Sequence, residues 1–239
     1  MILYFFILIR LYFILLYLRY YNFYYYFFYI SLKLYKLRIK NYCINIFYLN
    51  FFFISDIMIN LKTPIYSDDV KDLKVGDVIS ITGTIYTARD QAHKRIVEDG
   101  EPFSLDGQVI FHAGPIIKEE ANDNYEVIAI GPTTSMRMNP YEADVIEKGV
   151  RVIIGKGGMD ENVRQALIDN EAIYTVATGG CAALYVDAVL KTKDVTWLDL
   201  GIPEAMWELE VESFGPLIVA MDSKGNSLYD WLFKTYLHL

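Results

Sequence analysis

The chain has 239 residues and a formal net charge of −8, but charge and composition are divided unevenly along it. Residues 1–57 carry a charge of +5 and contain 12 of the 20 tyrosines and 10 of the 14 phenylalanines, without any alanine, glycine or valine, whereas residues 58–239 carry −13. The acidity of the larger part argues against a nucleic-acid partner. Its single cysteine, Cys181, supports neither a disulfide framework nor a metal centre, so we expect no metal ligands on this chain.

Three interpretations compete for residues 1–57. A membrane anchor should offer ~20 apolar residues with few charges, but Arg10 and Arg19 interrupt the run. A signal peptide would need a basic start and a small-residue cleavage site, and neither is present. The composition favours a spurious extension, translated from A/T-rich DNA upstream of the true initiator Met58, and a membrane anchor is the second interpretation. We therefore expect one cytoplasmic domain over residues 58–239, without membrane contact if Met58 is the start.

Apolar periodicity, glycine and proline divide this domain into short elements. In chain order they predict a strand at 75–86, a helix at 87–100, strands at 108–112 and 125–131, a helix at 140–148, a strand at 150–154, a helix at 161–170, a strand at 172–177, a helix at 181–190, and strands at 206–211 and 215–221. Asp160 is the expected N-cap of the third helix. The alternation of strands and helices indicates an α/β fold with a mixed sheet.

The segment GPTTSMR at 131–137 follows a predicted strand and begins a helix. Ligands collect at such carboxyl ends of strands in open α/β sheets. The hydroxyl groups alone are explained by helix capping, but Arg137 lies one helical turn after Thr133, and its planar guanidinium suits a carboxylate. The pattern predicts a dicarboxylate site in which Thr133 moves a proton.

The segment GKGG at 155–158 is a second passage from a strand through a turn to a helix. Flanking glycines leave the ammonium group of Lys156 unobstructed, and the start of a helix favours anions. An incidental surface lysine in a glycine-rich turn is an equally good interpretation of this motif taken alone.

Other candidate groups have simpler structural explanations. The segment ARDQAH at 88–93 is typical of a solvated helix start, or His93 is a hydrogen-bonded structural histidine, while His112 and His238 have no comparable surroundings. Cys181 is at the start of a predicted helix, but packing explains it better than nucleophilic chemistry. The acidic run at 204–212 reads as a solvated or partner-facing edge.

Six segments in order resemble one known family. They are ARDQAH (88–93), AGP (113–115), GPTTSMRM (131–138), IGKGGM (154–159), GGCAAL (179–184) and FGPLIVAMD (214–222). This order is similar to that of the β subunit, or C-terminal domain, of class I fumarate hydratases and L(+)-tartrate dehydratases, which are iron–sulfur hydro-lyases. The resemblance covers residues 62–229, and residues 1–57 have no counterpart in it.

The resemblance implies a swivelling three-layer β/β/α domain and a small dicarboxylate substrate. It also implies a separate α subunit that carries a 4Fe-4S cluster on three cysteines, in a heterodimer or a dimer of heterodimers. Thr133 matches the family's catalytic threonine, and Arg89, Arg137 and Lys156 match residues that hold substrate carboxylates. We expect these three cations to converge around Thr133 in one cleft.

The substrate is the least determined part of the resemblance. Reversible dehydration of (S)-malate to fumarate is the expected reaction, with a tartrate or methylfumarate-type hydro-lyase, or a non-catalytic dicarboxylate-binding module, as alternatives. Met136 stands where the family usually has glycine, and Asn139 stands where aspartate is common. A larger side chain beside Arg137 would narrow the pocket and so affect the substrate more than the reaction class.

Overall fold

The computed structural model describes residues 58–120, 124–180 and 182–230, so the predictions for residues 1–57, Cys181 and His238 lie outside the described part and stay predictions. The elements in chain order are β1 (Ile59–Lys62), α4 (Ser67–Val70), β2 (Val78–Thr87), α5 (Asp90–Glu98), β3 (Val109–Phe111), β4 (Ile116–Glu119), β5 (Tyr125–Ala129), η1 (Ser135–Met138), α6 (Asn139–Glu147), β6 (Val152–Gly155), α7 (Glu161–Asp169), β7 (Ile173–Val176), α8 (Ala182–Val186), β8 (Val189–Thr196), η2 (Leu198–Leu200) and β9 (Met206–Met221). Among the helices described, none has the length and apolar character that a membrane span requires.

Five strands form a closed mixed sheet in the order β2–β3–β6–β7–β9, and β9 pairs back onto β2. Strands β2, β3, β6 and β7 run parallel to one another, whereas β9 is antiparallel to both of its neighbours in the ring. Strand β1 extends the sheet beside β2, and β8 extends it beside β9. The predicted α/β class with a mixed sheet is confirmed, and the carboxyl ends of the parallel strands meet at one edge.

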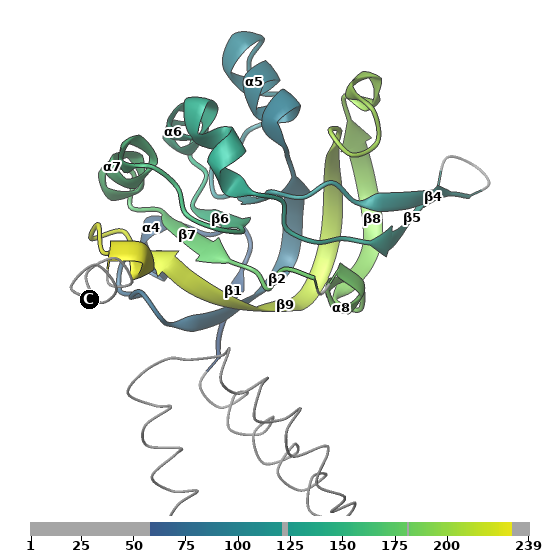
Figure 1. Ribbon diagram of the computed structural model, residues 1–239. Coiled ribbons are helices and arrows are strands. Elements are labelled where there is room, and N and C mark those ends of the chain that lie inside the picture. Colours follow the sequence, from purple (N-terminus) through teal and green to yellow (C-terminus); the bar gives the residue numbers. More distant parts are fainter. Residues whose placement is uncertain (1–57, 121–123, 181, 231–239) are drawn as a thin grey trace, which may run out of the picture. The chain divides into compact units, whose positions relative to one another are not determined.

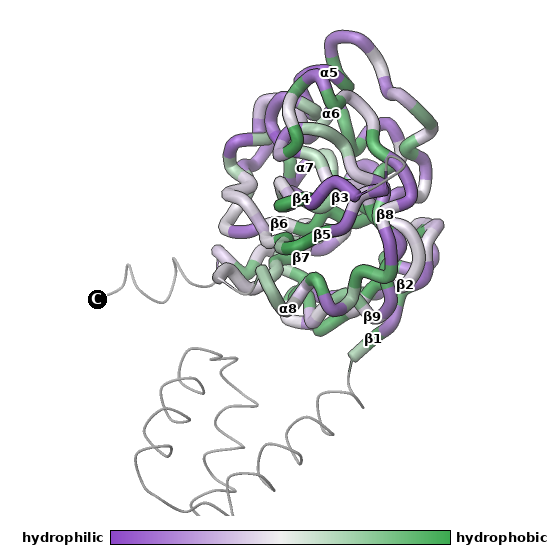
Figure 2. The backbone as a smooth tube through the Cα atoms, turned by 90° about the vertical axis from the view of Figure 1, so that its right-hand side faces the viewer, coloured by the Kyte–Doolittle hydropathy of each residue, from purple (hydrophilic) through white to green (hydrophobic). Residues whose placement is uncertain are grey.

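The parallel strands are buried on both faces, which explains their continuous apolar sequences. In β6, Val152 and Ile154 join one hydrophobic cluster, whereas Ile153 joins a second cluster with residues of α5, α6 and α7. The first cluster contains residues from all five strands of the ring and lies on its enclosed face. Helices α5, α6 and α7 lie side by side over the other face (Figure 1). Hydrophobic residues accordingly follow the strands of the ring, while the outer loops are mostly hydrophilic (Figure 2).

Several predicted elements need correction. Residues 206–221 form one strand, not two, because Ser213 takes a left-handed conformation (φ 50°) and shifts in register let β9 bend without ending. The helix predicted over 181–190 ends at Val186, and β8 begins three residues later. Strands β1 and β4 were not predicted as strands at all.

The acidic run at 204–212 is not a free edge, as the sequence had suggested. Lys193 of β8 pairs with Glu208 at 2.5 Å, and Lys191 pairs with Glu210 at 3.0 Å, across the β8–β9 pair. Cross-strand pairs of opposite charge stabilise an antiparallel pairing. The carboxylates therefore help to fix β8 beside β9.

Candidate active site

The four residues predicted from the sequence are attached to one edge of the sheet, where parallel strands end. Arg89 follows β2 by two residues, and Lys156 directly follows β6. The backbone N–H of Thr133 donates to the carbonyl of His112, which directly follows β3, at 2.7 Å. Arg137 lies in η1, the short helix that begins two residues after Thr133. The fold thus brings together backbone segments that are far apart in the sequence.

The two arginines are each held by a carboxylate of the same chain. Nη2 of Arg89 lies 3.0 Å from Glu204, and Nη2 of Arg137 lies 2.6 Å from Asp90. Burial opposes ionisation of Asp90, but hydrogen bonds and the charge of Arg137 outweigh it and lower the pKa of Asp90. A guanidinium group has five N–H donors, so one ion pair leaves donors for a further ligand.

Gly114 makes room for Arg89. A Cβ atom at residue 114 would lie 2.9 Å from Nη1 of Arg89 and 2.6 Å from the carbonyl oxygen of Pro203. The glycine of the AGP segment is therefore explained by the close approach of the arginine side chain.

Lys156 is exposed and forms no ion pair with any residue described. Its backbone N–H donates to Oγ of Ser135 at 3.0 Å, and its carbonyl accepts from the N–H of Ser135 at 3.0 Å. Thr134 forms a parallel bridge with Lys156. These contacts lay the turn at 131–137 directly against the turn at 155–158, so the two glycine-anchored motifs form one structural unit.

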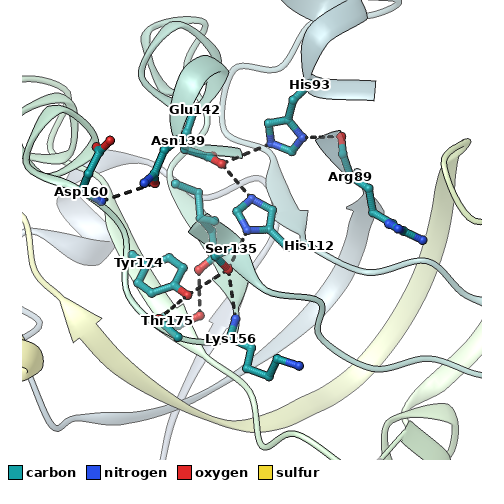
Figure 3. Close-up of polar contacts among 12 residues, drawn as sticks. Arg89, His93, His112, Ser135, Asn139, Glu142, Lys156, Asp160, Tyr174 and Thr175 are labelled. Carbon is teal, nitrogen blue, oxygen red and sulfur yellow. Dashed lines mark hydrogen bonds and ion pairs between the residues drawn. The ribbon is translucent and has the colours of Figure 1, made fainter. Parts of the chain in front are cut away.

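A buried cluster of His93, His112, Ser135 and Glu142 lies behind these turns (Figure 3). Oε2 of Glu142 is 3.3 Å from Nε2 of His93 and 2.8 Å from Nε2 of His112. Nδ1 of His93 is 2.9 Å from the carbonyl oxygen of Arg89, and Nδ1 of His112 is 2.9 Å from Oγ of Ser135. The side chains of the two histidines and the glutamate are fully buried.

The surroundings of His93 determine its protonation. Nδ1 lies 2.9 Å from a carbonyl oxygen, which can only accept, so Nδ1 must carry a proton, whereas Nε2 faces Oε2 of Glu142 at 3.3 Å. Burial lowers the pKa of His93, but the charge and hydrogen bond of Glu142, the Arg89 carbonyl and the charge of Asp90 together outweigh burial and raise it. The carboxylate beside Nε2 and the raised pKa both favour the imidazolium form of His93.

His112 and Glu142 complete a neutral group. Burial, aided by the nearby charge of His93, lowers the pKa of His112 against the pull of Glu142, so this ring is neutral. Burial would raise the pKa of Glu142, but the two imidazole rings that contact its Oε2 outweigh burial and lower the pKa below its ordinary value. One carboxylate thus meets one positive and one neutral ring.

Two histidines and one glutamate also match the donor set of some zinc sites. Neither Nε2 atom directs a good hydrogen bond at Glu142, and Oε1 of Glu142 has no hydrogen-bond partner among the residues described. A divalent ion beside a single carboxylate would nevertheless leave a net positive charge in a fully buried site, which is costly. A proton on His93 balances the charge of Glu142, so a proton can hold this group together without a metal ion.

Sequence reasoning proposed the exposed residues of the candidate site and missed the buried cluster behind them. His93 is not at a solvated helix start, and the structural-histidine alternative describes it better. The expectation that His112 has no comparable surroundings is wrong. The position of His112, directly after a buried strand like Arg89 and Lys156, is the signal that could have identified it. The roles of Thr133, Arg89, Arg137 and Lys156 stay predictions at this point.

Comparisons with known proteins agree on one family. The family model described as "Fumarase C-terminus" matches residues 51–232. A provisionally named L(+)-tartrate dehydratase subunit beta of Methanocaldococcus jannaschii is 50% identical over 173 residues, which cover 70% of this chain and 88% of that protein. The L(+)-tartrate dehydratase subunit beta of Escherichia coli is 43% identical over 171 residues, which cover 70% and 85%. A provisionally named class I fumarate hydratase of Geobacillus stearothermophilus is 45% identical over 181 residues, but the chain spans only 35% of that longer protein.

Proposed function

The chain belongs to the fumarase C-terminus family, and from this premise we propose that it is the β subunit of an iron–sulfur hydro-lyase that works with a separate α subunit. Two relatives that the chain matches over most of their length carry the name of a β subunit. The longer relative, of which the chain spans about a third, supports the idea that a further domain completes the enzyme. The swivelling three-layer arrangement expected for the family is part of this proposal.

We propose a four-carbon hydroxy-dicarboxylate as the substrate, with L(+)-tartrate as the first compound to test and (S)-malate as the second. The names of the two β-subunit relatives favour tartrate over malate. Met136, which stands beside Arg137 and is 63% exposed, is a second reason to test more than one substrate. A methylfumarate-type dicarboxylate completes the panel.

In the proposed reaction, Thr133 accepts or returns the C–H proton next to a substrate carboxylate. A threonine hydroxyl is a poor base alone, so a neighbouring group, expected from the α subunit, must activate it. Arg89, Arg137 and Lys156 would bind the substrate carboxylates and stabilise the negative charge that develops as the proton leaves. Binding both ends of the substrate also fixes its orientation.

The iron–sulfur cluster does not fit this chain. Such clusters are held by several cysteine thiolates, whereas the whole sequence has two cysteines, Cys43 and Cys181. We therefore assign the cluster to the α subunit.

One observation carries the proposal: the turns that bear Thr133 and Lys156 are bonded to each other and to the end of β3, at the edge where Arg89 also emerges. Figure 3 shows the side chains of Arg89 and Lys156 extending from the buried cluster toward the same side. Cations that lie together at one edge of the sheet suit a small dianion better than cations dispersed over a surface would.

Replacing Thr133 tests the catalytic role against simple binding. In the complex with the α subunit, we expect Thr133→Ala to reduce kcat by at least ~10²-fold, the usual scale for a general base. Thr134→Ala is the matched control, because Thr134 is the neighbouring exposed threonine and its side chain makes no capping hydrogen bond. An unchanged rate in Thr133→Ala would remove this residue from the mechanism, and retained affinity without any turnover in the wild type would favour a binding module.

A further inference from the structure

We propose that the buried cluster of His93, His112, Ser135 and Glu142 is a positioning network that holds the substrate-binding turns at a fixed separation. The inference rests on the proposed function, because it takes the residues on these turns to be the ones that bind and convert the dicarboxylate. None of the four residues of the cluster is proposed to contact the substrate. Each acts by positioning a neighbouring residue.

The cluster forms an unbroken path between two predicted substrate-binding residues. The path begins at the carbonyl oxygen of Arg89 and passes through His93 to Glu142, and then from Glu142 through His112 to Ser135. It ends at the backbone N–H of Lys156, which donates to Oγ of Ser135 at 3.0 Å. Segments that follow β2 and β6 are thereby joined through side chains from α5, α6 and η1.

The predicted proton-transfer residue is bonded to the same path. The N–H of Thr133 donates to the backbone carbonyl of His112 at 2.7 Å, so the backbone of Thr133 is bonded to the residue whose ring lies in the cluster. Three of the four predicted site residues are thus bonded to members of the buried cluster, through backbone atoms in each case. Because the network holds these residues by their backbone atoms, it leaves their side chains available to bind a ligand.

The hydroxyl of Ser135 is the junction of the network. It lies within hydrogen-bond distance of His112 Nδ1, of the Lys156 N–H and of the Tyr174 hydroxyl, at 2.9, 3.0 and 3.0 Å. The Lys156 N–H can only donate to this hydroxyl, while the Tyr174 hydroxyl also lies 2.8 Å from the Gly157 carbonyl. The three contacts together give the Lys156 turn a fixed place beside Ser135.

Apolar side chains could fill this space at lower cost. Burying a charged pair costs more solvation than its attraction usually returns, and such pairs are best explained where they specify a geometry. The contacts of this buried charged pair lead to backbone atoms of the predicted site residues. Catalysis would need the positions of those residues to be fixed. We therefore assign the cluster a positioning role in preference to a role in bulk stability.

Ser135→Ala in the complex with the α subunit tests the role. We expect KM for the dicarboxylate to rise at least ~10-fold, because the Lys156 turn loses its anchor, while the complex stays assembled. Ser80→Ala is the matched control: Ser80 is equally buried, its hydroxyl has no hydrogen-bond partner among the residues described, and it belongs to β2. A lowered melting temperature with KM within twofold of the wild type would reduce the cluster to a structural feature and overturn the proposal.

A second measurement does not depend on activity. The chain contains three histidines, and ¹⁵N NMR of the labelled full chain reports the protons on each ring. We expect His93 to be doubly protonated and His112 to be neutral at pH 7, with Ser135→Ala shifting the signals of both rings. If the wild-type complex converts no dicarboxylate, the proposed function fails. The same proton pattern would still support the network as the connection between the two turns. Two neutral rings, or a stoichiometric metal in elemental analysis, would overturn it.

Discussion

Gly155 is required by the side chain opposite it. A Cβ atom at this position would lie 1.9 Å from Oγ of Ser135 and 2.9 Å from the Tyr174 hydroxyl oxygen. We expect Gly155→Ala to lower the free energy of unfolding by about 1–3 kcal/mol, the usual cost of overpacking. Denaturant unfolding would measure it against Gly158→Ala, whose added carbon would meet only ordinary contacts at 3.5 Å and beyond. Equal losses in the two variants would contradict this explanation.

Lys156 should matter for substrate binding and not for stability. Because its side chain is exposed and unpaired among the residues described, we expect Lys156→Gln to leave the melting temperature unchanged. Loss of a charge-assisted contact worth ~1.5–3 kcal/mol should raise KM at least ~10-fold. Lys118→Gln, at a lysine that pairs with Glu120 and Glu126 on the β4–β5 hairpin, is the control. Similar KM values for both variants would exclude Lys156 from the site.

At the residue scale, the sequence was informative where a motif is local and uninformative where partners are distant. The turns bearing Thr133 and Lys156 could be predicted because each carries its glycine and its polar groups within a few residues. The contact between the two turns joins residues 21 positions apart in the sequence. The pairing of Arg89 with Glu204 joins residues more than 100 positions apart. Glu142 reads as an ordinary polar residue of an amphipathic helix, and only the packing of α6 onto the sheet buries it.

The N-cap of α7 is the clearest local signal at the scale of elements. The side chain of Asp160 accepts a hydrogen bond from the N–H of Val163 at 3.1 Å, which confirms the predicted cap. Asp160→Ala should therefore destabilise the domain by about 0.5–2 kcal/mol. Glu161→Ala is a suitable control, since Glu161 is 80% exposed and its ion pair with Arg164 should contribute little. If both variants unfold at the same denaturant concentration, the cap does not stabilise the helix.

Most elements with a strong period were predicted, and the errors have physical causes. The first two residues of β8 were placed in a preceding helix and the rest of the strand was missed, because its apolar alternation is weak and its lysines find their partners on β9. The break expected near Gly215 did not appear, since the backbone conformation of Ser213 and the register shifts against β2 allow β9 to bend through it. Short strands such as β1 and β4 take their structure from the strands beside them.

At the scale of the whole molecule, the buried charges make stability depend on pH. The raised pKa of His93 adds stability that is complete below about pH 6.5 and is lost as the pH rises through the folded-state pKa. The lowered pKa values of His112 and Glu142 act in the opposite sense, and their stability is lost as the pH falls below about 6.5 and 4.5 respectively. Asp90 and Tyr174 are the other titratable groups that face this cluster.

A variant separates the contribution of His93 from the rest. The difference in unfolding free energy between the wild type and His93→Asn should narrow as the pH rises above 6.5, because only the wild type carries the raised pKa. Lys94→Gln, at a half-exposed lysine on the same helix, should show a constant difference over that range. A difference that widens with pH would show that His93 is neutral in the folded protein.

Reconstitution tests the central claim most directly. The purified chain would be assayed for dehydration of L(+)-tartrate and (S)-malate, alone and after mixing with an anaerobically prepared iron–sulfur α subunit. We predict no turnover by the chain alone and turnover of at least one of these dicarboxylates by the stable complex. Full activity of the chain alone, or a complex that forms but converts neither compound, would contradict the account.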